Sequence, residues 1–134
     1  MDWTLEVVPV PVADVDRAKR FYSEQVGFSV DHDTKVSDEM RVVQLTPSGS
    51  GCSIVISAGL FDTAPGSIKG LQLVVSDLDS ARAGLAERGV DVSQIMHFDG
   101  GSYVPGRGGD WNSFVYFDDP DGNSWAIQER PAGR

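Results

Sequence analysis

The fold of this chain is decided by the stretch Val12-Ala13-Asp14-Val15-Asp16-Arg17-Ala18, which returns in the second half as Val75-Ser76-Asp77-Leu78-Asp79-Ser80-Ala81. The valine, both aspartates and the alanine recur at matching places. A few such matches can arise by chance, but a repeated structural unit explains all of them together. The sequence therefore predicts two copies of one supersecondary unit.

Each copy reads as a strand followed by a capped helix. In the first copy, Leu5 to Val12 is rich in β-forming residues, and its apolar residues recur with a period of two. Asp14 then caps a helix, because its carboxylate accepts from the free N–H groups of the first turn, and Gly27 ends that helix. In the second copy, Leu71 to Val75 provides the strand and Asp77 the cap.

Three further strands are expected after each helix, which gives the order βαβββ twice. They are predicted over residues 28–32, 40–45 and 52–57 in the first copy, and over residues 90–97, 113–117 and 124–128 in the second. Residues 59–69 read as a linker between a first module at 3–58 and a second at 70–130 within a single domain. The glycine-rich residues 99–110 read as the longest loop.

The first strand is expected to have an open edge. Pro9 and Pro11 both lack an N–H group, and because they lie two residues apart the missing donors fall on the same side of the strand. The strand should therefore be partly unpaired or lie at a seam of the sheet. An open edge also invites a second copy of the chain, so a homodimer is one expectation.

Composition narrows the class of partner. The chain has 134 residues, a formal net charge of −9 and one cysteine, Cys52. Phosphate backbones repel an acidic surface, so nucleic acid is not an expected partner. No apolar run approaches the roughly 20 residues that a membrane span needs, and no signal peptide is evident at the N-terminus. These features favour a cytoplasmic protein.

Three motifs in order resemble the glyoxalase/bleomycin-resistance/extradiol-dioxygenase group, the vicinal oxygen chelate superfamily. They are residues 12–22, the Val26-Gly27-Phe28 segment and the turn Asp119-Pro120-Asp121-Gly122-Asn123, and the resemblance extends over roughly residues 3–130. It implies an α+β fold in which two tandem βαβββ modules form a U-shaped mixed sheet around a cleft, with the helices outside. Such clefts bind small molecules, often beside a divalent metal.

The resemblance also gives four places where metal-using members hold a ligand. Carried over one at a time, these places fall on Val7, Val55, Gly70 and Ala126. None of these side chains has a nitrogen or oxygen atom to donate to a cation. The sequence therefore predicts neither a metal site nor a cofactor.

Strand alternation predicts which residues line the cleft. The inner wall should mix small, apolar and amide side chains, which suits an uncharged or aromatic organic ligand. Aromatic residues on and beside the glycine-rich loop could act as a lid, or could merely cover the open end of the sheet. The candidate ligand-binding residues are Val7, Gln44, Val55, Ser57, Gln72, His97, Phe98, Tyr103, Trp111, Ala126 and Gln128.

The leading functional hypothesis is a metal-free protein that binds or sequesters a small organic molecule. The first alternative is a metal-independent isomerase, lyase or cyclase on the same scaffold, with His97 as the general acid–base candidate beside Tyr103 or Asp99. A metal-dependent glyoxalase or dioxygenase is the second alternative. Common nucleophile, phosphate-loop and zinc motifs are absent from the sequence.

Overall fold

The computed structural model describes residues 1–60 and 62–133, and the chain divides into two compact units. Unit 1 comprises residues 1–68 together with residues 119–123, and unit 2 comprises residues 69–118 together with the segment from Ser124 onward. Each unit contains one copy of the predicted strand, helix and strands. The expectation of two tandem βαβββ modules with mixed strand pairing is therefore confirmed.

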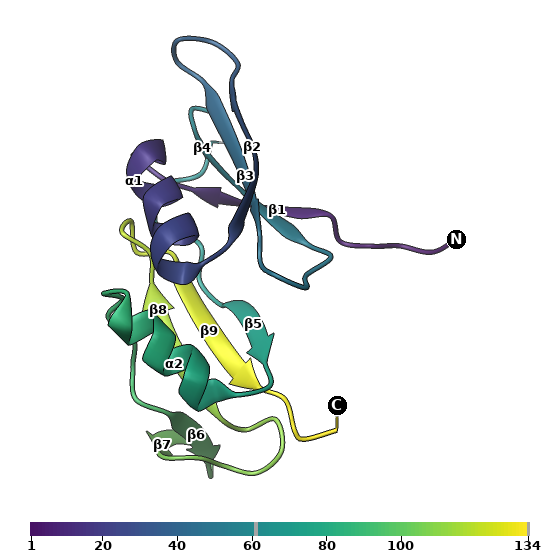
Figure 1. Ribbon diagram of the computed structural model, residues 1–134, viewed down its shortest axis with the longest axis vertical. Helices are drawn as coiled ribbons and strands as arrows, with labels where there is room; N and C mark the ends of the chain where they lie inside the picture. The colour runs from purple at the N-terminus through teal and green to yellow at the C-terminus, as the bar shows by residue number, and fades with distance from the viewer. Residues whose placement is uncertain (61, 134) are drawn as a thin grey trace. The chain divides into compact units, whose positions relative to one another are not determined.

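Unit 1 is a four-stranded sheet with one helical segment against it (Figure 1). Its elements are β1 (Val7–Pro11), α1 (Val15–Arg20), η1 (Phe21–Val26), β2 (Ser29–Lys35), β3 (Arg41–Thr46) and β4 (Ser53–Ala58). The strand order is β1-β4-β3-β2, in which only the β1–β4 pair is parallel. β1 lies at the edge of the sheet and pairs with β4 alone, as Pro9 and Pro11 predict.

The first helix begins as predicted but changes its winding halfway. Asp14 accepts from the Arg17 N–H at 3.1 Å, and Gly27 ends the segment with a φ of 100°. Between them α1 passes into η1, a π-helix, where one turn holds more residues than in an α-helix. The first copy has one residue more between cap and glycine (14 to 27) than the second (77 to 89). The wider turn accommodates that extra residue.

The turn of residues 119–123 belongs to unit 1, although it connects two strands of unit 2. The buried Asn123 amide donates to the Pro11 carbonyl at 2.9 Å and to the Asp119 carboxylate at 2.8 Å, and its oxygen accepts from the Ile68 N–H at 3.1 Å. The Tyr22 hydroxyl donates to Asp119 at 2.7 Å. The first and last residues of the turn, Asp119 and Asn123, are therefore buried in unit 1, which goes beyond the hairpin turn that the sequence indicates.

Unit 2 is a five-stranded sheet covered on one face by α2 (Figure 1). Its elements are β5 (Leu71–Val75), α2 (Leu78–Glu87), β6 (Met96–Asp99), β7 (Ser102–Pro105), β8 (Phe114–Asp118) and β9 (Ser124–Glu129). The strand order is β5-β9-β8-β6-β7, and only β5 and β9 pair in parallel. Asp77 caps α2 by accepting from the Ser80 N–H at 3.0 Å.

Two predictions for unit 2 are wrong. The strand expected over residues 90–97 begins only at Met96, because the Ser93 hydroxyl accepts from the Tyr116 N–H at 2.9 Å and thereby replaces a ladder bond. The loop expected over residues 99–110 contains β7, which pairs with β6 through the turn at Gly100 and Gly101. Both glycines have positive φ, which a tight hairpin turn requires.

Candidate functional site

The face of the second sheet opposite α2 carries the residues of most interest. In β8, Val115 and Phe117 are buried on the helix side, so the alternation places Phe114 and Tyr116 on the other face. The sequence pattern alone does not show which aromatic residues of this strand face away from the helix. The face that carries Phe114 and Tyr116 is called the open face below.

Four aromatic rings gather on the open face and are called the aromatic platform: Phe98, Tyr103, Phe114 and Tyr116. The ring centroids of Phe98 and Tyr103 are 3.8 Å apart, and those of Tyr103 and Tyr116 are 5.4 Å apart in a T-shaped contact. Phe98 is 45% exposed and Tyr103 is 46% exposed. A contiguous cluster of exposed aromatic rings on a sheet is typical of an interaction site.

The Tyr116 hydroxyl has a distinct environment within the aromatic platform. It is buried, and none of the described residues forms a hydrogen bond of ordinary geometry with it. Burial, followed by the nearby Tyr103 hydroxyl, raises the pKa of the Tyr116 hydroxyl above its ordinary value. The phenol therefore stays neutral over the physiological range and keeps both a donor and an acceptor.

A chain of hydrogen bonds borders the aromatic platform on the β5 side. It joins the side chains of Gln72 and Gln128 to the Trp111 carbonyl and is called the polar relay below. The Gln72 amide nitrogen donates to the Gln128 amide oxygen at 2.8 Å, and the Gln128 amide nitrogen donates to the Trp111 carbonyl at 2.8 Å. Ala126 lies between Gln72 and Tyr116 in the strand register. Because the side chain of Ala126 is only a methyl group, it fills little of the space above the sheet at this position.

The loop that carries Trp111 is fastened to the sheet. Both polar atoms of the Asn112 amide bond the Phe98 backbone at 2.9 Å, so this side chain continues the edge of β6. A Cβ atom at Gly108 would lie 2.4 Å from the Asn112 carbonyl, so only glycine fits there. Trp111 is the one non-glycine residue with positive φ in the described ranges, at 62°. Such a conformation costs energy and is common at functional sites.

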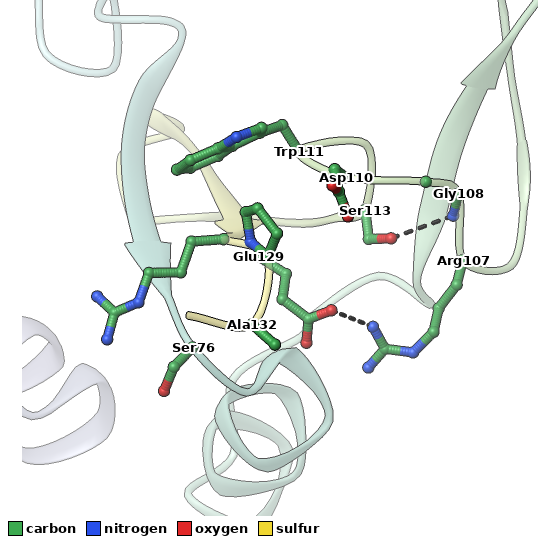
Figure 2. Close-up of a pocket in the computed structure, with 11 residues that line it drawn as sticks. Ser76, Arg107, Gly108, Asp110, Trp111, Ser113, Glu129 and Ala132 are labelled. Carbon is green, nitrogen blue, oxygen red and sulfur yellow. Dashed lines mark hydrogen bonds and ion pairs between the residues drawn. The ribbon is translucent and has the colours of Figure 1, made fainter. Parts of the chain in front are cut away.

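A pocket of about 370 Å³ lies beside this loop (Figure 2). Trp111 lines it together with Arg107 and Glu129, which form an ion pair. Arg107 also pairs with Asp79, and Glu129 accepts from the Leu78 N–H at 2.8 Å at the start of α2. The hydrogen bond to Glu129, followed by that to Asp79, raises the pKa of the Arg107 guanidinium above its ordinary value. These charges are satisfied by one another, which fixes the base of the loop.

Apart from His97, the predicted ligand-binding residues fall into two groups. Gln72, Ala126 and Gln128 lie on the open face with Phe98 and Tyr103, while Trp111 joins them through its carbonyl. The remaining predicted residues apart from His97 lie in unit 1, on the sheet face opposite α1: Val7, Gln44, Val55 and Ser57.

Two residues of the unit 1 group, Gln44 and Ser57, have polar side chains. The Gln44 amide donates to Asp31 at 3.3 Å and to the Ser53 hydroxyl at 3.4 Å. The Ser57 hydroxyl is buried without a partner among residues 1–60 and 62–133. Val7 is half-exposed at the edge of the sheet.

His97 is separated from the aromatic platform. It follows Met96 and precedes Phe98 in β6, so the alternation turns its side chain to the face opposite Phe98 and Tyr103. Its Nδ1 atom lies 2.8 Å from the Gly106 carbonyl, and no described carboxylate bonds its ring. The described residues therefore contain no acid–base triad centred on His97.

The predicted ligand-binding residues do not include Phe114 and Tyr116 of the aromatic platform, and sequence reasoning missed Asn112 altogether. It supports the strand that carries Phe98 through side-chain bonds. Its only signal in the sequence is an asparagine close to a run of glycines, which by itself is typical of any turn.

A chain of two βαβββ copies has the architecture of the group that its motifs resemble. A family model described as the Glyoxalase/Bleomycin resistance protein/Dioxygenase superfamily matches residues 2–127. The chain therefore belongs to this superfamily.

Solved structures of similar chains agree with this assignment. The chain is 32% identical to TnmS3, an antibiotic binding protein from Streptomyces sp. CB03234, with 97% of this chain and 98% of that chain covered and a TM-score of 0.78. It is 33% identical to a glyoxalase/bleomycin resistance protein from the same organism, with 93% and 99% covered and a TM-score of 0.74. A superfamily member from Sphaerobacter thermophilus DSM 20745 is 25% identical, with 96% and 98% covered and a TM-score of 0.77. No match was found among curated proteins.

The donor set does not fit the metal that many members of the superfamily use. The four places predicted for ligands carry Val7, Val55, Gly70 and Ala126, none of which has a coordinating side chain. Across the part of the chain that the structure describes, no group of three or more His, Cys, Asp or Glu side chains could hold a metal ion. Within the same residues, no helix is long and apolar enough to cross a membrane.

Proposed function

We propose that this protein binds a small organic molecule through a flat apolar ring system that packs on the aromatic platform. The observation that carries the proposal is the contiguous set of four rings on the open face, two of which are nearly half exposed. Similarity over almost the whole chain to an antibiotic binding protein supports the same class of ligand.

The physical basis is the fit between flat rings and this surface. Aromatic contacts favour offset-stacked or edge-to-face geometry, and each adds about 0.5–1.5 kcal/mol beyond the area that it buries. Phe98 and Tyr103 present ring area to solvent, so a ligand ring can cover area that is now wet. The amide groups of Gln72 and Gln128 give the same face a polar border, which fixes the orientation of the ligand on the platform.

The test is a titration of the protein with fluorene, a flat probe without hydrogen-bonding groups, followed by ligand-observed NMR. Binding should weaken by about five- to tenfold in Tyr103→Ala, because one ring contact is lost. Trp3→Ala is the matched control, since Trp3 is an 87% exposed aromatic residue of unit 1. Equal losses in both variants, or no binding to the unaltered protein, would refute the proposal.

We also propose that binding needs no metal ion. The support is the donor-free set Val7, Val55, Gly70 and Ala126. Elemental analysis of protein purified without chelator should find less than one tenth of an equivalent, roughly, of any divalent transition metal. One bound equivalent would overturn this part of the proposal and revive the metal-dependent alternative.

The edge of the second sheet supports a homodimer as part of the proposal. β5 pairs with one strand only and so leaves backbone groups available to a second chain. β1 also lies at an edge but offers few such groups, because Pro9 and Pro11 lack N–H groups and the Pro11 carbonyl is already bonded to Asn123. Sedimentation velocity at micromolar concentration measures the state directly, and a monomer at all concentrations would contradict it. The single Cys52, which is a free thiol, suits a reducing cytoplasm.

A further inference from the structure

The orientation of the polar relay is fixed by a backbone carbonyl. The Trp111 carbonyl can only accept a hydrogen bond, so the Gln128 amide must turn its nitrogen toward it. The Gln128 oxygen then faces Gln72, which must in turn donate through its own nitrogen. Reversing either amide would set two acceptors or two donors against each other. The amide oxygen of Gln72 is therefore the end of the relay.

That oxygen is available to a ligand. The one hydrogen bond of the Gln72 side chain uses its nitrogen, and the residue is exposed on the open face. We infer that Gln72 is a specificity-determining residue, which accepts a hydrogen bond from an N–H or O–H group on the edge of a planar ligand. This inference rests on the proposed function and names the class of ligand more narrowly.

The strand register places such a ligand. Gln72, Ala126 and Tyr116 form one row across β5, β9 and β8. Neighbouring strands lie about 4.8 Å apart, so the Cα atoms of Gln72 and Tyr116 are separated by roughly 10 Å. The methyl group of Ala126 forms the floor between them. A ring lying over Ala126 meets the aromatic platform on one side and directs its edge to Gln72 on the other.

The loop of Trp111 and Asn112 holds the polar relay in place. The positive φ of Trp111 determines the direction of its carbonyl, and this conformation is unfavourable for a residue with a side chain. Asn112 next to it is bonded twice to the Phe98 backbone. Because Gln128 is held by this fixed carbonyl, it acts as a positioning residue for Gln72 and does not itself need to contact the ligand.

Three probes of the same shape test the inference. Carbazole, fluorene and dibenzofuran differ at one ring position, which carries an N–H donor, a CH₂ group or an oxygen acceptor. Carbazole should bind about three- to tenfold tighter than fluorene, as one added neutral hydrogen bond predicts. Dibenzofuran should bind no tighter than fluorene, because an acceptor gains nothing from the Gln72 oxygen.

Variants then assign the preference to the relay. Gln72→Leu should remove the preference for carbazole and leave fluorene binding within about twofold, which also shows that the platform is intact. Gln128→Leu should reduce the preference although Gln72 is still present, because its amide is no longer oriented. Gln94→Leu, at an exposed glutamine outside the three strands β5, β8 and β9, is the control and should change neither value.

The outcomes separate the inference from the proposed function. If no probe binds the unaltered protein, the proposed function falls and the inference falls with it. If all three bind equally, if dibenzofuran is preferred, or if the carbazole preference survives in Gln72→Leu, the proposed function stands and the role of Gln72 is overturned.

Discussion

Replacing Asn123 with alanine tests how unit 1 is held together. The side chain is fully buried, and three hydrogen bonds are lost: two from its nitrogen, to Pro11 and Asp119, and one to its oxygen from Ile68. At about 1 kcal/mol each, the free energy of unfolding should fall by about 3 kcal/mol. For a chain of 134 residues, the entropy of unfolding is about 0.28 kcal/mol/K, so the melting temperature should fall by about 10 °C.

The assay is thermal and urea unfolding followed by circular dichroism. Asp118→Ala is the matched control, because Asp118 precedes the same turn but is exposed, and its stability should be unchanged within about 0.5 kcal/mol. Asn123→Asp keeps the shape but sets a second carboxylate beside Asp119, so it should destabilise at least as much as alanine. A loss below about 1 kcal/mol in Asn123→Ala would refute the reasoning.

Three further predictions concern single positions. Gly66→Ala should destabilise by more than about 2 kcal/mol in urea unfolding, because a Cβ atom there would lie 2.0 Å from the Asp121 carbonyl oxygen; Gly49→Ala, with a similar φ and open space, should lose only about 1 kcal/mol. Hydrogen bonds from an arginine and a lysine hold the pKa of Asp33 well below its usual range. Its contribution to stability is therefore present above the unfolded pKa of about 4 and is lost as the pH falls below it; the stability difference between the unaltered protein and Asp33→Asn should shrink between pH 7 and pH 3, and a constant difference would contradict this. Ala126→Leu should fill the space beside the aromatic platform and weaken carbazole binding by about tenfold or more in an NMR titration, without lowering the melting temperature.

Local patterns predicted the parts of the fold that local chemistry determines. Asp14 and Asp77 cap their helices through bonds three residues away, and Gly27 adopts the left-handed conformation that a helix end requires. Strand alternation also placed Gln72 and Gln128 on one face, opposite the partly buried leucines of β5 and the buried Trp125 and Ile127 of β9. These features depend on spacings of two to four residues, which a sequence displays directly.

The features that the sequence did not reveal depend on distant partners. The sequence of β7 indicates a loop because the glycines on both sides of it mark turns, and turns occur in loops and hairpins alike. The contact between Asn123 and Pro11 joins residues more than a hundred positions apart, so no local pattern encodes it. The conformation of Trp111 is likewise set by its surroundings, since its residue type disfavours positive φ.

The place of residues 119–123 inside unit 1 has a consequence for biosynthesis. As the nascent chain leaves the ribosome, the strands and helix of unit 1 emerge before the residues that bond the Pro11 carbonyl and the Tyr22 hydroxyl, which follow 112 and 97 positions later. The first repeat on its own lacks these buried hydrogen bonds. If the gene were divided between the two repeats, the first fragment would have to bind residues 119–123 of the second fragment to complete unit 1.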